Sequence, residues 1–461
     1  MFNIRHAGLF CLLGSIALPS FAAEAEKNED TEKATHRLHL SKARNDSTRH
    51  SIFEKNRPKG NKEIPVPHFC IHTSDHKFAL TIGGQVNPIL GFDFRNNLYE
   101  QDGGGINFAT NAIPVPAVKG KRSDFYINAL NADIDFQVVG FGGSDDQITG
   151  YIKFGTNGID NGLQMKDAYV SWRGFTAGRK TTLFKDGVAA QPPTVDPQGP
   201  CGMVDGTAYE VSYISPEYKG FRGAIGIATP TYYHSSGRYY GPDYREWGSD
   251  NSLEGEQVTN PNYYSQNVPD LPLWVEWKAS EYNRVRVSGI LRTFIYRDMI
   301  EEKKRHAFGW GIMLSGNWNP IKPLIFYLQG VYGQGIGNYI QDLSGLPLSF
   351  TPCNEHIGKM CANPMMGVNL GVTYNINKRW QVNAVASEAR IWNVGPYAEE
   401  NATEEGHFND YRYGFYFAAN GFYNITSYLQ VGLEYLYGRR GTWNVGSGID
   451  NRIQTQFMLT F

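Results

Sequence analysis

Three arginines share one face of an alternating segment near the middle of the chain. Arg284, Arg286 and Arg292 are separated by even numbers of residues, and the apolar residues Val285 and Val287 stand among them. Side chains two residues apart on a β-strand point to the same side. A row of fixed positive charges along one wall raises the local concentration of anions. The alternative is that these arginines pair with carboxylates and only brace a polar wall.

The same alternation places other charged residues on the polar face of their own segments. The basic members are Lys153, Arg222, Arg412 and Arg452, together with one of Arg179 and Lys180. The acidic members are Asp93, Asp133, Asp135, Asp167, Glu210, Glu276 and Glu434. We interpret both sets as lining residues of a wet interior, where mutual pairing is again the alternative for any one of them.

Other residue clusters give weaker indications of chemistry. His68, Cys70, His72 and His76 have spacings that suit a metal ion, but they stand in a linker without a partner motif, so no metal site is predicted. The run GQGIGN at 333–338 ends a strand and opens no helix, which argues against a nucleotide-binding loop. No Ser/His/Asp set and no carboxylate pair of defensible geometry is found, so neither an enzyme nor a cofactor is predicted. The near-balanced charge does not imply nucleic acid as a partner.

The last residues of the chain have the alternating pattern of a β-strand with one apolar and one polar face. In DNRIQTQFMLTF, residues 450–461, the apolar side chains Ile453, Phe457, Leu459 and Phe461 alternate with polar ones. One face suits lipid and the other suits water. A strand that ends the chain on an aromatic residue is an aggregation hazard at an open edge, whereas in a closed barrel it is the seam with the first strand. A half-buried strand of a soluble sandwich is the alternative for this segment alone.

Sixteen such segments lie between residues 78 and 461, and their connections alternate in length. Short turns are expected at positions such as 215–219, 319–322, 377–378 and 424–426. The long connections are 99–120, 185–206, 230–270, 298–304, 336–365, 393–410 and 440–449. This alternation is typical of an outer-membrane barrel with periplasmic turns and external loops. The predicted fold is therefore all-β: a transmembrane antiparallel up-and-down β-barrel of about sixteen strands, too wide for side chains to fill its interior.

One long connection differs in composition from the others. Residues 185–206 read KDGVAAQPPTVDPQGPCGMVDG, and four prolines make this segment stiff. Its charged residues are Lys185, Asp186, Asp196 and Asp205. We predict that it folds into the barrel and constricts the channel; an external surface loop is the alternative.

The N-terminal part of the chain is distinct from the barrel. Residues 1–23 have the charged start, apolar core and small-residue end of a secretory signal peptide, and no other stretch is long and apolar enough for a transmembrane helix. Residues 24–77 form a charged periplasmic tail or linker without a sustained heptad. In an oxidising compartment, Cys353 and Cys361 are the expected disulfide pair, and pairing of Cys70 with Cys201 is left open.

The barrel region, 78–461, resembles the DcaP-like outer-membrane porins and, more distantly, the phosphate-selective OprP group. The resemblance rests on LTIGGQVNPILGFDF in the first strand, on residues 123–137, on FTAGRKTTLFKDG leading into PPTVDPQGP, and on NRIQTQF near the end. It implies a homotrimer of sixteen-stranded barrels that passes small anionic solutes such as dicarboxylates. By position, Arg179 and Lys180 would flank the constriction loop. The long loops at 230–270 and 336–365 and the absence of a clear coiled coil in the tail depart from the family pattern.

The sequence thus predicts a passive porin in the outer membrane of a Gram-negative bacterium, with lipid and small anionic solutes as its partners. The alternative is a structural or adhesive barrel whose long external loops bind a surface partner.

Overall fold

The computed structural model describes most of the chain from Leu38 onward, and the statements below concern those residues. The described ranges are 38–42, 69–73, 77–95, 107–115, 123–142, 144–156, 162–230, 259–260, 266–280, 282–298, 301–346, 348–353, 356–392, 411–443 and 446–461. The predicted signal peptide and most of the predicted tail lie outside them. In the part of the chain that is described, no helix is long and apolar enough to span a membrane.

The described chain consists of strands and three short 3-10 helices. The strands are β1 (Leu38–Lys42), β2 (Phe69–Thr73), β3 (Phe78–Asp93), β4 (Asp124–Gly140), β5 (Ile148–Thr156), β6 (Leu163–Trp172), β7 (Phe175–Thr181), β8 (Thr207–Ile214), β9 (Phe221–Ala228), β10 (Thr259–Asn260), β11 (Leu271–Ser280), β12 (Asn283–Asp298), β13 (Lys303–Ile321), β14 (Leu324–Gln334), β15 (Phe350–Cys353), β16 (His356–Ala362), β17 (Pro364–Asn375), β18 (Trp380–Ile391), β19 (Tyr411–Asn424), β20 (Leu429–Thr442) and β21 (Ser447–Thr460). The 3-10 helices are η2 (Thr110–Ala112), η4 (Gly337–Tyr339) and η5 (Gln341–Leu343).

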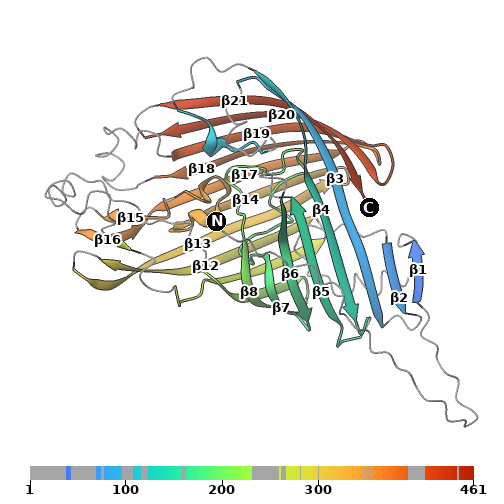
Figure 1. Ribbon diagram of the computed structural model, residues 1–461, viewed down its shortest axis with the longest axis horizontal. Helices are drawn as coiled ribbons and strands as arrows, with labels where there is room; N and C mark the ends of the chain where they lie inside the picture. Colours follow the sequence, from blue (N-terminus) through green and yellow to red (C-terminus); the bar gives the residue numbers. More distant parts are fainter. Residues whose placement is uncertain are drawn as a thin grey trace, which may run out of the picture. The chain divides into compact units, whose positions relative to one another are not determined.

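Sixteen of these strands close into one antiparallel barrel (Figure 1). They are β3–β9, β11–β14 and β17–β21, each paired with its neighbour in this order. The last strand pairs with the first, from Arg452 opposite Asp93 to Thr460 opposite Gln85. Closure leaves no sheet edge facing lipid, which is why a barrel is one of the few architectures that can cross a bilayer. The predicted fold class and the seam at the final strand are confirmed.

The two faces of each strand follow the predicted alternation. On β21, Ile453, Phe457 and Leu459 are 41–46% exposed on the outside, whereas Arg452 and Gln454 are buried. On β12, Val285, Val287 and Leu291 are likewise exposed between the buried arginines. The outer face is apolar because it meets hydrocarbon.

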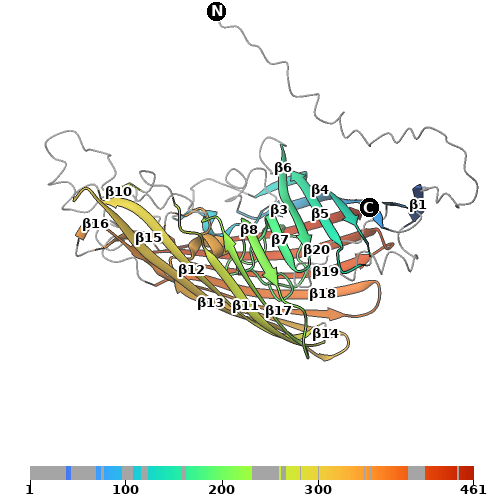
Figure 2. The ribbon, with the colours of Figure 1, turned by 90° about the horizontal axis from the view of Figure 1, so that it is seen from below.

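The strands differ in length around the barrel. β7, β8 and β9 have seven, eight and eight residues, whereas β12 and β13 have sixteen and nineteen. Figure 2 shows the short green strands and the longer yellow ones of the same sheet. The barrel therefore has a short wall at β7–β9.

Two strands precede the barrel in the region predicted as a charged linker. β2 pairs with residues 79–82 of β3, beyond the point where β21 ends, and β1 pairs with β2. These strands were not predicted, because segments of five residues beside charged sequence give too weak a pattern. β2 pairs with the edge of β3 that β21 leaves free in this region.

The long connection 336–365 contains a hairpin of β15 and β16. Phe350 and Met360 from the hairpin pack against Phe294 and Tyr296 of β12, and the rings of Phe294 and Phe350 stack at 4.9 Å. This contact lies on the loop side of the barrel, where β12 and β13 extend past β11. Cys361 is disulfide-bonded. The side chain of Cys353 lies outside the described residues, so the pairing of these two stays a prediction, while Cys70 and Cys201 are buried thiols.

Candidate functional site: a lumen narrowed by three inward segments

The connection between β7 and β8, residues 182–206, runs inside the barrel. Near its start, the Asp186 carboxylate accepts hydrogen bonds from Arg284 on β12 and from Ser315 on β13, each at 2.7 Å. Near its middle, the backbone N–H groups of Val195 and Asp196 donate to the Glu434 carboxylate on β20, at 3.0 and 2.7 Å. The loop therefore spans the inner wall from β12 to β20. This is the segment predicted to constrict the channel, and its effect on conduction stays a prediction.

Three asparagine side chains hold the loop between these two carboxylate contacts. The donors are Asn317 on β13, Asn369 on β17 and Asn420 on β19, which reach the backbone carbonyls of Val188, Ala190 and Pro193 at 3.3, 3.3 and 2.9 Å. A loop inside a barrel must find partners for its own backbone groups, and amide side chains provide them without adding charge. Sequence reasoning missed these residues because it considered only charged side chains on the inner face.

Two further connections fold inward beside this loop. Residues 107–115 with η2 and residues 335–350 with η4 and η5 form an apolar cluster with it that includes Phe108, Phe184, Val204, Ile340 and Leu343. Val204 and Ile340 form an antiparallel bridge between two of the segments. Residues 107–115 and 336–350 lie in connections that were expected from their length to be external. The three segments pack against the inner wall on the side of β12–β20.

The predicted row of arginines, Arg284, Arg286 and Arg292, lies beneath these segments. Arg222, Arg284 and Arg286 surround the Glu276 carboxylate at 2.6, 2.6 and 2.9 Å. Arg286 also lies over the ring of Trp274, 4.1 Å from its centroid. Arg284 and Arg286 are 4% and 2% exposed. Three guanidinium groups and two carboxylates, Glu276 and Asp186, thus form one buried network between wall and loop.

Arg292, the third arginine of this row, is also held by an ion pair and is buried. Arg292 donates to the Asp270 carboxylate and to the Gly335 carbonyl, both at 2.9 Å, and lies over the Tyr339 ring at 4.8 Å. The prediction of an anion path along Arg284, Arg286 and Arg292 is therefore wrong. Parity correctly gives the side on which a residue lies, but it does not reveal whether a loop covers that side.

Other predicted lining residues are also structural pairs. Arg452 binds Asp93 at 3.2 Å, and Lys180 binds Glu210 at 3.0 Å, with each of these side chains buried. Arg412 follows a different course because a β-bulge at 411–413 shifts the register of β19. It is exposed and lies 4.9 Å from the centroid of the Trp443 ring, whereas its neighbour Tyr411 points into the buried interior.

The inner wall of β4–β7 is the part that the three segments leave accessible. Lys153 on β5 binds Asp133 on β4 at 3.0 Å, and these side chains are 24% and 8% exposed. Asp167 on β6 is partly exposed, whereas Asp135 is buried. Arg179 on β7 is not part of this wall, because it lies on the outer face opposite Ala168 and the 59% exposed Tyr209. Arg179 donates to Thr207 at 3.1 Å. At the start and end of the loop, Lys185 and Asp205 form an ion pair in which both side chains are partly exposed.

A register shift adds a cation that parity did not predict. The pairing of β5 with β6 is irregular after Lys153, so Lys166 and Asp167 both face the interior. The position of the Lys166 side chain over Gly155 shows this, because Gly155 lies opposite the inward-facing Asp133. Lys166, like Lys153 and Lys185, is partly exposed.

Burial and charge set the protonation of the carboxyls on the inward segments. Burial raises the pKa of Asp196 and the pKa of Asp342 to about 6. Burial acts on Asp186 in the same direction, but Arg286 and Arg284 outweigh it and hold the pKa of that carboxyl below its usual value. The loop is therefore fixed by one ionised carboxylate at its start, and the two carboxyls deeper in the packed region take up a proton at a higher pH than an exposed aspartate does.

The described residues contain no group of three or more His, Cys, Asp or Glu side chains placed to hold a metal ion.

Known structures match this arrangement, although no family model and no curated protein does. The chain is similar to the outer membrane channel DcaP of Acinetobacter baumannii, with a TM-score of 0.65 and 15% identity over 84% of this chain and 99% of that one. Weaker matches include OmpT, an outer membrane protein of Vibrio cholerae (TM-score 0.48, 11% identity, 84% and 98% coverage), and an anion-selective porin from Comamonas acidovorans (0.47, 10%, 83% and 100%).

The closed sixteen-stranded barrel with its inward loop has the fold of the outer-membrane porins. Within that class, its fold is similar to that of the DcaP channel. Such a fold supports an outer-membrane location.

Proposed function

We propose that this protein is an outer-membrane porin through which small hydrophilic solutes, preferentially anions, diffuse passively. The observation that carries the proposal is the charge of the accessible lumen wall. Three partly exposed cations lie there, Lys153, Lys166 and Lys185, beside the partly exposed carboxylates of Asp124, Asp133, Asp167 and Asp205. Lys153 and Lys185 pair with Asp133 and Asp205, whereas Lys166 forms no ion pair among the described residues, and such a fixed positive charge in a confined aqueous path attracts anions.

A dicarboxylate is the solute class that fits this wall best. The cations come from two adjacent strands and from the loop, so a solute with two anionic ends can meet a different cation at each end. Each contact is made in water, which keeps binding weak enough for release. Neither a cofactor nor a catalytic step is part of this function.

The test is the reversal potential of the purified protein in a planar bilayer under a salt gradient. We expect anion selectivity in the wild type and a reduction of roughly tenfold in the anion-to-cation permeability ratio when Lys153, Lys166 and Lys185 are all replaced by glutamine. Lys166→Gln alone gives a smaller change in the same direction, and it spares the ion pairs because Lys166 forms none among the described residues. Cation selectivity in the wild type would refute the anion preference.

We further propose that the chain is exported by a signal peptide at 1–23 and assembles as a homotrimer through its short wall. Strands of seven or eight residues are shorter than the roughly 9–11 residues that a tilted strand needs to span the hydrocarbon layer. The outward residues Phe175, Val211, Ile225 and Ile227 are nonetheless 50–61% exposed on this wall. A second copy would cover them.

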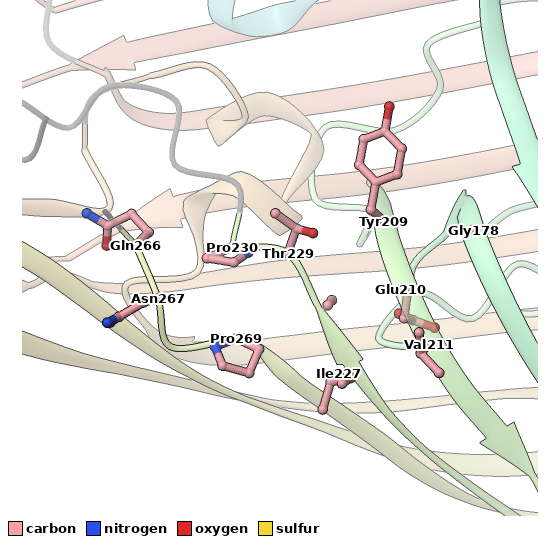
Figure 3. A pocket seen from close by; sticks show the side chains of 11 residues that line it. Gly178, Tyr209, Glu210, Val211, Ile227, Thr229, Pro230, Gln266, Asn267 and Pro269 are labelled. Atoms are coloured by element: carbon pink, nitrogen blue, oxygen red, sulfur yellow. The ribbon is translucent and has the colours of Figure 1, made fainter. Parts of the chain in front are cut away.

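A notch at the upper end of this wall gives the assembly a testable contact. It has a volume of about 440 Å³ and lies between β8, β9 and residues 266–269, with Val211 and Ile227 at one end and Gln266 and Asn267 at the other (Figure 3). Val211→Glu would leave a carboxylate in the subunit contact, so we expect it to convert trimers to monomers in native mass spectrometry. Val287→Glu, on the tall wall, is the control; trimers that persist in the Val211 variant would contradict this interface.

A further inference from the structure

An apolar groove lies on the lipid-facing surface of the tall wall, across β12–β18. Its volume is about 600 Å³. One row of outward residues builds it: Gly316 lies opposite Leu328, Leu328 opposite Leu370, and Leu370 opposite Ala386. The leucines are 45% and 55% exposed, and the small residues at both ends of the row leave hollows beside them. The surface is therefore concave, and its outward side chains are apolar or glycine along this row.

The groove opens toward the end of the barrel that carries the short turns. Trp318 and Phe326 line that end, with their rings stacked at 5.4 Å, and Trp318 is 61% exposed. The turn between β13 and β14 follows Trp318 directly. Aromatic side chains at this depth mark the boundary between hydrocarbon and headgroups. Short turns mark the periplasmic side, so the groove belongs to the inner leaflet.

A basic cluster lies immediately below this boundary. It consists of Lys322 in the β13–β14 turn and of Lys378 and Arg379 in the β17–β18 turn, and all three are exposed. The two turns are adjacent because the Asn375 N–H donates to the Pro323 carbonyl at 2.8 Å. Residues 319–323 and 375–379 include no acidic side chain. None of the three cations forms an ion pair within the described part of the chain.

We propose that this surface binds an anionic phospholipid, with one acyl chain in the groove and the phosphate at Lys322, Lys378 and Arg379. The inference rests on the outer-membrane location proposed above. Charge complementarity selects the ligand, since each cation near a membrane surface contributes about 1 kcal/mol toward an anionic lipid. A second copy is the less favoured occupant, because a symmetric contact at this face would bring the basic turns of two copies together. The short wall at β7–β9, by contrast, is separated from β17 by the four strands β11–β14.

The experiment is lipid titration of the full-length protein in detergent, followed by native mass spectrometry with dioleoyl phosphatidylglycerol or dioleoyl phosphatidylethanolamine. We expect the wild type to retain the anionic lipid preferentially, and each cation replaced in Lys322→Gln, Lys378→Gln and Arg379→Gln to weaken that retention about fivefold. Lys219→Gln, an exposed cation in the β8–β9 turn, is the matched control and should change nothing. Ala386→Leu fills one hollow and should weaken the retention of both lipids.

Three outcomes would overturn the lipid site. They are equal retention of the two lipids by the wild type, unchanged retention in the triple variant, and disulfide cross-linking between copies through Leu370→Cys, which would show that a second copy occupies the groove. The reversal potential of the same variants separates this proposal from the porin proposal. Loss of lipid retention with unchanged anion selectivity leaves the channel function standing, and anion selectivity without lipid preference refutes the lipid site alone.

Discussion

Replacing Asp186 by asparagine tests whether the buried arginine network anchors the inward loop. In the wild type, three guanidinium groups face two carboxylates, so the network carries one excess positive charge. The substitution raises this excess to two while Arg284 remains almost fully buried. Removing one partner of a buried ion pair typically costs about 3–5 kcal/mol, because the other charge stays desolvated and uncompensated.

The expected result is a loss of about 3–5 kcal/mol in the free energy of unfolding, measured by urea titration in detergent. We also expect increased open-channel current noise, because the first part of the loop loses its contact with β12 and β13. Asp205→Asn is the matched control: it removes the other loop carboxylate that pairs with a cation, but the Asp205 side chain is 36% exposed. An exposed pair contributes about 0–1 kcal/mol.

A double-mutant cycle completes this test. Arg284→Gln combined with Asp186→Asn removes both charges, so the double variant should lose clearly less stability than the sum of the two single variants. Equal losses for Asp186→Asn and Asp205→Asn, or strict additivity in the cycle, would refute the role of the network as an anchor.

Two further predictions concern the packing of the inward segments. Burial raises the pKa of Asp196 and Asp342 to about 6, so the stability that their protonated forms contribute is fully present below about pH 4 and is lost as the pH rises through 6. Asp342→Asn should therefore flatten this part of the profile of unfolding free energy against pH. A steeper profile in this variant would contradict the predicted sign. Gly202→Ala should displace the loop and change the conductance, because the added Cβ would lie 2.1 Å from the Glu388 carbonyl oxygen, whereas the control Gly330→Ala meets no atom within 4 Å. Unchanged conductance in Gly202→Ala would show that the loop adjusts freely.

The barrel could be predicted from the sequence because lipid imposes a strict rule on it. Every second residue of a lipid-crossing strand must be apolar, and this rule gave the correct faces for Val285, Val287, Phe457 and Leu459. The closing strand followed the same rule, since Ile453, Phe457 and Leu459 alternate with polar residues. No comparable rule applies to the interior.

The site was less predictable because it depends on what covers the inner wall. The inward positions of Arg284 and Arg292 follow from parity, but the segments that cover them come from connections about 90 to 100 residues before Arg284 and about 45 residues after Arg292. Lys166 was not predicted as an inward residue, because an irregularity of one residue in strand pairing reverses which side chains of a strand point inward. The asparagine contacts to the loop carbonyls could not be predicted, because the sequence shows only that an amide side chain points inward and not what it binds.

The two ends of the described chain meet on one strand. The backbone N–H and carbonyl of Gly84 exchange hydrogen bonds with those of Phe461, both at 3.0 Å, and the pairing of β2 with β3 begins two residues away, at Phe69 opposite Ile82. In chain order, the segment of β3 next to β2 has both of its partners close by, whereas one edge of residues 85–93 pairs with a strand about 360 residues later. Until that strand is in place, this edge is unpaired and open to a chaperone or to a second chain. The strand order thus concentrates the risk of misassembly on nine residues of the first barrel strand.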